Sequence, residues 1–309
     1  MIEVKFHKGL SKVYGISRSE FLEATKESEP YMHYIKGRKE AFAICPLCEN
    51  PVKLLGVYAR LEKQRPHARH LKKNVPGLAD FDEYKYLQCP YHRENANYIM
   101  EAKSREDMTE YNKEILALAH DYFDKCIYIL RKTTGLVISD KLAEEIAADY
   151  MMHPGYMTYD ITRENIPYIM GMCMSGKNLV KRMVEENSPL YEMLKDKKDI
   201  TLEPMKPTFE YKSAKTLYRI ESKEGYLGIS FNITRYRFAT NKTSELREYL
   251  KLHIGMPDGK GTYNTYAEKE IEVDPFFFNR LIHSRNTRSP RSGLADIADR
   301  ILTLETSEN

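Results

Sequence analysis

Paired cysteine and histidine residues constrain this chain more than any other feature of its sequence. Three pairs have the same spacing, with two residues between the partners: Cys45-Pro-Leu-Cys48, His67-Ala-Arg-His70 and Cys89-Pro-Tyr-His92. A tight turn directs both side chains of such a pair toward one point, so that both can bind one ion. Zinc takes four tetrahedral ligands in structural sites, so six donors exceed what one closed site needs.

Three thiolates and one imidazole make the commonest structural zinc site that these donors can build. We therefore predict that Zn²⁺ is the cofactor and that a cysteine-rich set with one histidine binds it. The predicted ligands are Cys45, Cys48, His70 and Cys89, with His67 and His92 as substitutes for the histidine. Short apolar runs at 41–44 and 52–57 flank the first pair, which is the strand, knuckle, strand arrangement of a zinc ribbon. The alternative is that these are ordinary turns with buried free cysteines.

The string CPLCENPVKL followed by RPHARH resembles the amino-terminal zinc-finger-like module of competence protein CoiA-like proteins. In that family a C-P-x-C turn precedes a strand and then a P-H-x-x-H element, and a restriction-endonuclease-like nuclease domain follows. The resemblance covers only residues 45–70. Residues 105–200 depart from it, because they read as helical and show no strand carrying an Asp with a downstream Glu-x-Lys. The resemblance therefore does not predict nuclease activity for this chain.

The hydrophobic patterns divide the chain into three parts and predict an α+β fold. Residues 1–104 form a zinc-ribbon-like α+β module, 105–200 a helical region, and 201–309 a strand-rich α+β domain. Ser17 and Ser139 are expected helix caps, and apolar residues from Ile115 to Leu130 predict one long amphipathic helix that ends near Gly135.

Several shorter segments are assigned from their periodicity. Strands are expected at 217–221, 225–238 and 262–273, and the middle run alternates with Leu227, Ile229, Phe231 and Ile233 on one face. Residues 84–87 are a candidate for a further strand that leads into Cys89. Residues 243–252 are expected to form a helix. The carboxy-terminal stretch reads as a helix, a basic loop, and a closing helix from about 293 to 302.

That basic loop is the predicted site for nucleic acid or another phosphate ligand. Its predicted contacts are Arg280, Arg285, Arg288 and Arg291, with His283 between them. Arginine suits phosphate because its guanidinium donates two parallel hydrogen bonds. A solvated loop between two helices is the alternative. Lysines and arginines between the metal-binding pairs give the amino-terminal module a possible basic face of its own.

Composition limits the function classes without choosing one. The 48 Lys and Arg residues against 45 Asp and Glu give a net charge of +3, which is too mild to require an anionic partner. No long apolar stretch or leader-like amino terminus occurs, so we expect no membrane insertion and a cytoplasmic location. No nucleophile or metalloprotease motif occurs, which favours a protein that is not an enzyme.

The first functional hypothesis is a zinc-containing cytoplasmic protein that associates with DNA or RNA. Bacterial defence, DNA uptake and mobile elements are its expected settings. The alternative is a non-enzymatic interaction or sensor protein that binds a partner protein or a small phosphate ligand. A metal-dependent nuclease ranks below both.

Overall fold

The computed structural model divides the chain into two compact units, residues 1–94 and 95–309, which are described separately. The structure describes residues 3–10, 12–58, 66–87, 89, 91, 108–158, 161–206, 216–223, 225, 227–240, 246–257, 263–274, 276–284 and 292–303. The fold class is α+β, as predicted.

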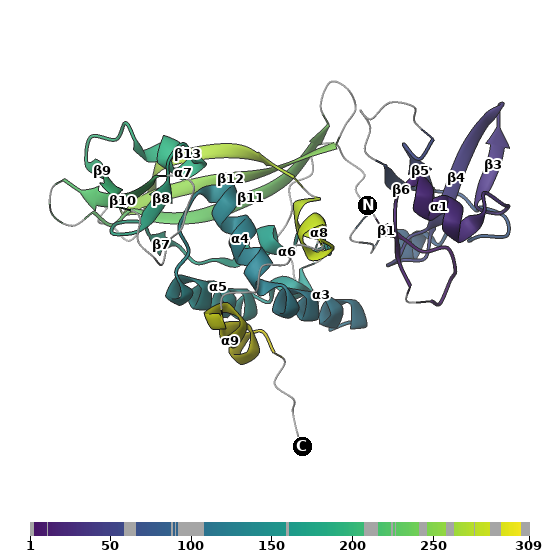
Figure 1. The fold of residues 1–309 in the computed structure, drawn as a ribbon, viewed down its shortest axis with the longest axis horizontal. Coiled ribbons are helices and arrows are strands. Elements are labelled where there is room, and N and C mark those ends of the chain that lie inside the picture. The colour runs from purple at the N-terminus through teal and green to yellow at the C-terminus, as the bar shows by residue number, and fades with distance from the viewer. Residues whose placement is uncertain are drawn as a thin grey trace, which may run out of the picture. The chain divides into compact units, whose positions relative to one another are not determined.

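Unit 1 is built on a four-stranded antiparallel sheet in the order β3-β4-β5-β6 (Figure 1). Its strands are β3 (Met32–Ile35), β4 (Arg38–Ile44), β5 (Pro51–Leu55) and β6 (His67–His70). A two-stranded ribbon of β1 (Glu3–Val4) and β2 (Tyr14–Gly15), α1 (Arg18–Thr25) and α2 (Glu83–Leu87) complete the unit. Alternate residues of β4 and β5 point into a small core that also contains Val4 and Phe21.

The helix cap and the two strands predicted around the first cysteine pair are present in unit 1, but one further strand prediction is wrong. Ser17 caps α1, since its hydroxyl accepts a hydrogen bond from the Glu20 N–H at 3.1 Å. Strands β4 and β5 flank the Cys45–Cys48 turn as predicted. The strand prediction for 84–87 is wrong, because these residues belong to α2. Asp82 precedes this helix, and its carboxylate accepts a hydrogen bond from the Lys85 N–H in the first turn.

Unit 2 contains seven of the α-helices described in the chain, and none of the described helices is both long and apolar enough to cross a bilayer. The helices are α3 (Glu110–Asp121), α4 (Phe123–Thr134), α5 (Asp140–Met152), α6 (Ile166–Cys173), α7 (Pro189–Leu194), α8 (Phe277–Ile282) and α9 (Ser292–Ile301), with a short 3₁₀ turn at Gly155–Met157. The predicted single long helix is two helices, because Tyr122 leaves the helical region with φ −121° and ψ 29°.

Two antiparallel sheets complete unit 2. The larger sheet has the order β13-β12-β11-β7, and the smaller has the order β8-β10-β9. Their strands are β7 (Lys177–Asn178), β8 (Met183–Glu185), β9 (Ile200–Met205), β10 (Leu217–Ser222), β11 (Ser230–Thr240), β12 (Leu246–Pro257) and β13 (Tyr263–Val273). The predicted helix at 243–252 is wrong from Leu246 onward. Leu250, Leu252 and Ile254 are buried in alternation, which is the period of a strand.

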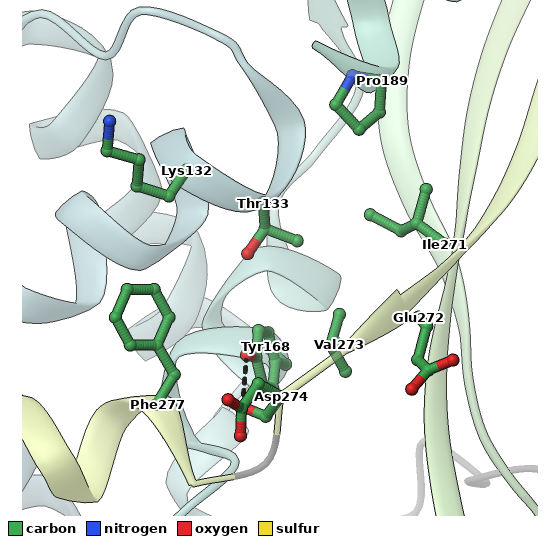
Figure 2. A pocket seen from close by; sticks show the side chains of 9 residues that line it. All are labelled: Lys132, Thr133, Tyr168, Pro189, Ile271, Glu272, Val273, Asp274 and Phe277. Atoms are coloured by element: carbon green, nitrogen blue, oxygen red, sulfur yellow. Dashed lines mark hydrogen bonds between the residues drawn. The ribbon is translucent and has the colours of Figure 1, made fainter.

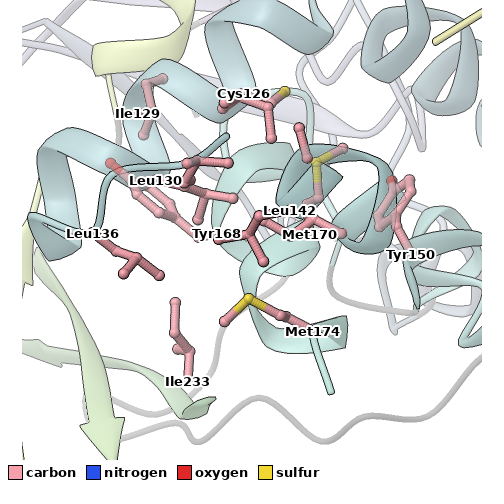
Figure 3. Close-up of a cluster of buried hydrophobic side chains, with 14 of the residues drawn as sticks. Cys126, Ile129, Leu130, Leu136, Leu142, Tyr150, Tyr168, Met170, Met174 and Ile233 are labelled. Carbon is pink, nitrogen blue, oxygen red and sulfur yellow. The ribbon is translucent and has the colours of Figure 1, made fainter. Parts of the chain in front are cut away.

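One continuous core joins the helices of unit 2 to its larger sheet. Helix α6 packs between α4 and β11 so closely that a Cβ on Gly171 would lie 2.6 Å from Leu130 and 2.9 Å from Ile233. Figure 3 shows Leu130, Ile233 and Met170 in this cluster of buried side chains. The predicted helical region and strand-rich domain therefore share a single unit, since neither could bury its apolar face without the other.

Replacement of Gly135 by alanine should destabilise unit 2 more than the same change at Gly225. Both glycines have positive φ, +83° and +60°, where a side chain costs about 1–2 kcal/mol. A Cβ at Gly135 would lie 2.0 Å from the Ser188 side chain, whereas nothing lies within 4 Å at Gly225. Overpacking adds about 1–3 kcal/mol, so Gly135→Ala should lower the free energy of unfolding by about 2–5 kcal/mol. Urea unfolding followed by circular dichroism measures both variants, and equal losses would contradict the packing argument.

Candidate metal centre

Four side chains of unit 1 converge in a group that could bind a metal ion. One donor atom from each of Cys45, Cys48, His70 and Cys89 lies within 4.8 Å of all the others. The Cys45 and Cys89 sulfurs are 3.7 Å apart, and the Cys48 sulfur is 3.2 Å from His70 Nε2. Zinc–sulfur bonds of about 2.3 Å in a tetrahedron place two sulfurs about 3.8 Å apart. The donor set therefore fits a tetrahedral ion.

Three separate segments bring these donors together. Cys45 directly follows β4, and its N–H donates to the Asn50 carbonyl at 2.8 Å, which closes the turn before β5. Glu49 completes this turn in the left-handed region with φ 55°. His70 is the last residue of β6. Cys89 follows α2, where its N–H donates to the Tyr86 carbonyl at 3.1 Å.

A buried amide links two of these segments and was not anticipated from the sequence. The Asn50 side chain is fully buried and forms two hydrogen bonds with the backbone of Asp82. Its Nδ2 donates to the Asp82 carbonyl at 3.1 Å, and its Oδ1 accepts from the Asp82 N–H at 2.6 Å. This clip holds the start of the α2 segment, and through it Cys89, against the Cys45–Cys48 turn. An asparagine in the C-E-N-P string was the available signal, but its partner is 32 residues away.

Burial and crowding shape the protonation of the three thiols. Cys45, Cys48 and Cys89 have exposed fractions of 0%, 7% and 5%. Burial raises the pKa of the Cys45 thiol to about 12. A hydrogen bond from Cys45 lowers the pKa of Cys48, whereas the pKa of Cys89 is raised by its hydrogen bond with Cys45. A bound cation would oppose the effects of burial and crowding and favour ionisation of the thiols.

The two histidines of the HARH pair point to opposite faces of β6. His70 lies three positions after His67, and an odd spacing in a strand directs side chains to opposite faces. Among the described residues only His70 joins the cysteines, and His67 is not part of the group. His92 lies outside the described residues, as do Arg285, Arg288 and Arg291 of the predicted basic loop.

Arg280 is the one predicted phosphate contact that the structure describes. Its Nη2 lies 2.7 Å from Asp274 Oδ2, and its guanidinium also lies 5.7 Å from the centre of the Phe277 ring. An acidic partner already neutralises this arginine, so its side chain is a weaker attraction for phosphate than its position in a basic run suggests.

Unit 2 contains a cavity of about 320 Å³ beside this ion pair, which the sequence did not reveal. Figure 2 shows Thr133, Val273 and Phe277 around it, with the Tyr168 hydroxyl donating to the Asp274 carbonyl at 3.0 Å. The lining carries one cation, Lys132, against two carboxylates, Asp274 and Glu272. Both carboxylates are ion-paired, Asp274 with Arg280 and Glu272 with Arg247, so the lining does not present two free negative charges.

Comparisons with known proteins identified no relative of this chain. No family model, curated protein or solved structure matches the chain. The resemblance of residues 45–70 to CoiA-like proteins therefore stays a prediction.

Asn50→Ala should weaken metal binding at the Cys₃His group. The change leaves the Asp82 N–H and carbonyl without their buried partner, at about 1–3 kcal/mol each. Loss of a group that orients ligands typically costs about 10–100-fold in metal affinity. Titration with Co²⁺, whose absorption reports thiolate coordination, measures this loss.

Asn74→Ala is the matched control for that titration. Asn74 also binds backbone, since its Oδ1 accepts from the Phe81 N–H at 2.8 Å, but it is exposed and does not hold a ligand segment to the Cys45–Cys48 turn. We expect its Co²⁺ affinity to stay within about twofold of the unmodified protein. Equal weakening in both variants would show that Asn50 has no special role.

Proposed function

We propose that this is a zinc-containing, nucleic-acid-associated protein in which zinc has a structural role in unit 1. The observation that carries the proposal is the convergence of Cys45, Cys48, His70 and Cys89 within 4.8 Å. A cytoplasmic location belongs to the same proposal, because the thiols must remain reduced to bind a metal.

The donor chemistry favours zinc in a closed site. Thiolate and imidazole donors suit Zn²⁺, whereas Mg²⁺ and Ca²⁺ prefer oxygen. Four protein ligands complete a tetrahedron and leave no position for a reactive water, which is the pattern of structural sites. The group contains no Asp or Glu among the residues described, so it lacks the oxygen ligands and general base of a metal-dependent nuclease.

Removal of any one of the four ligands should abolish tight zinc binding. Purified protein is expected to contain about one zinc ion per chain, and Cys45→Ser, Cys89→Ser and His70→Ala should each lose it. Elemental analysis by mass spectrometry measures the metal directly. Unfolding of unit 1, followed by hydrogen exchange, should accompany the loss because metal binding and folding are coupled in small zinc modules.

His67→Ala is the matched control, since it removes an imidazole from the same strand. It should retain the zinc ion, and so should His92→Ala. Zinc loss in His67→Ala with retention in His70→Ala would assign the fourth ligand to the other histidine. A metal-free protein with unchanged stability in the cysteine variants would overturn the zinc proposal.

Uneven charge supports the nucleic-acid part of the proposal. Residues 1–94 contain 17 Lys and Arg against 12 Asp and Glu, whereas residues 95–309 contain 31 against 33. Arg69 and Lys73, which lie on β6 and just after it, are exposed and have no acidic partner in the described part of unit 1. The small net charge of the whole chain therefore conceals a basic unit, which is the electrostatic pattern of phosphate-backbone binding.

Binding to DNA or RNA should be strongly salt-dependent. Each phosphate contact contributes a slope of about −0.7 to −0.9 to log K against log salt concentration. Fluorescence anisotropy with labelled oligonucleotides between about 50 and 200 mM salt measures this slope. The double variant Arg285→Ala, Arg288→Ala tests the predicted loop separately. Salt-insensitive association with a protein, and none with nucleic acid, would favour the interaction or sensor alternative.

A further inference from the structure

The β3–β4 hairpin of unit 1 ends in a tight turn that displays side chains without a structural role. Register pairs join Met32 to Ala41 at its base and Ile35 to Arg38 at its end, which leaves a two-residue turn of Lys36 and Gly37. Both turn residues have positive φ, 50° and 74°, as in the tight turns that suit twisted hairpins. Figure 1 shows the hairpin at one side of unit 1, where β3 is an edge strand of the sheet.

Apolar surface is exposed at this turn, whereas the base of the hairpin is buried. Tyr34 is 66% exposed and Ile35 is 37% exposed, although Ala41 and Ala43 farther along β4 are almost fully buried. A large side chain with this exposure contributes little to the core, and the tyrosine ring is available to an external ligand.

Two unpaired cations lie at the same end of the hairpin as the exposed tyrosine, with Arg38 paired to Ile35 on the face opposite Tyr34. Lys39 lies opposite Tyr34 in register but is paired with Glu27 at 2.6 Å. Lys36 and Arg38 are exposed, and neither has an acidic partner among the residues that the structure describes. The turn thus combines one free aromatic face with two free positive charges within five consecutive residues.

This combination matches single-stranded nucleic acid. Lys and Arg neutralise phosphates, and an exposed tyrosine can stack on an unpaired base whatever its identity. A protein partner could also use tyrosine and arginine, but the positive excess of unit 1 favours a polyanion. Duplex DNA fits less well, since its bases are already stacked.

We propose that the β3–β4 turn is a contact for single-stranded nucleic acid, with Tyr34 stacked on a base and Lys36 and Arg38 on phosphates. This inference rests on the proposed nucleic-acid association and specifies where that contact lies. The signal in the sequence was the string Tyr-Ile-Lys-Gly-Arg-Lys at 34–39, which mixes aromatic and basic residues around a glycine.

Anisotropy titrations of the full chain with single-stranded DNA, single-stranded RNA and duplex DNA test the proposal. Tyr34→Ala should weaken single-strand binding about tenfold, whereas Tyr34→Phe should retain it because stacking needs only the ring. The double variant Lys36→Ala, Arg38→Ala should reduce the magnitude of the salt slope by about 1.4, or about 0.7 for each lost phosphate contact.

Two control variants change the same residue types elsewhere. Tyr128→Ala removes a tyrosine that is 42% exposed on α4, and it should leave the affinity unchanged. Lys8→Ala with Lys12→Ala removes two exposed cations of unit 1 outside the hairpin, and it should leave the slope unchanged. Circular dichroism and zinc content confirm that each variant is folded.

The outcomes separate the two proposals. Binding by the unmodified chain that is unaffected by the hairpin changes would overturn the hairpin contact and leave the nucleic-acid association intact. Equal losses in hairpin and control variants would overturn it as well. No binding to any of the three probes at about 50 mM salt would overturn both proposals.

Discussion

The convergence of three cysteines and one histidine is the constraint on which unit 1 depends. It joins the turn after β4, the end of β6 and the segment after α2, which are far apart along the chain. The core beside it is small and contains alanines such as Ala41, Ala43 and Ala68. A unit of this size buries a modest fraction of its surface, so a metal that cross-links three segments would contribute a large share of its stability.

The sequence predicted the chemistry of the site and the four donors that converge in the structure, but it did not give the geometric reason why His70 and not His67 joins the cysteines. Cysteine spacing indicated a metal site because such pairs have few other uses in a chain with free thiols. The choice between His67 and His70 depends on which face of β6 is directed inward, and that phase is set by pairing with β5. Asn50 was missed for the same reason, since the value of its amide depends on the distant backbone of Asp82.

The prediction of secondary structure succeeded where the apolar residues fitted one spacing, and it failed where they fitted both a helix and a strand. Residues 217–221 lie in β10, and the described part of the predicted strand 262–273, from Tyr263 onward, lies in β13. The stretch around Leu250 has apolar residues that satisfy a helical and a strand spacing equally, and pairing with β11 and β13 decides between them. Long-range pairing is not visible in a local pattern, so no reading of residues 246–252 alone could have settled this segment.

Charge pairing distinguishes the basic residues of the two units. On β11 and β12, Arg237 is paired with Glu270 of β13 and Lys251 with Glu268, so these two cations are already neutralised. At the β3–β4 turn, Lys36 and Arg38 have no such partner among the described residues. The density of basic residues in a sequence is therefore a poor guide to anion binding, because the neighbouring strands decide which charges remain available.

The metal centre and the hairpin turn lie at opposite ends of one strand. β4 begins at Arg38, next to the turn, and ends at Ile44, next to Cys45. Seven residues of strand span about 20 Å, so a metal bound at Cys45 would be too far from the turn to touch a nucleic acid bound there. A metal could affect nucleic-acid binding at the turn only through the backbone of β4. The Cys45–Cys48 turn holds one end of this strand, and the proposed contact residues lie at the other end. If the hairpin binds nucleic acid as proposed, a metal at these donors would act as a scaffold for the binding surface, and its loss would impair binding by releasing the strand.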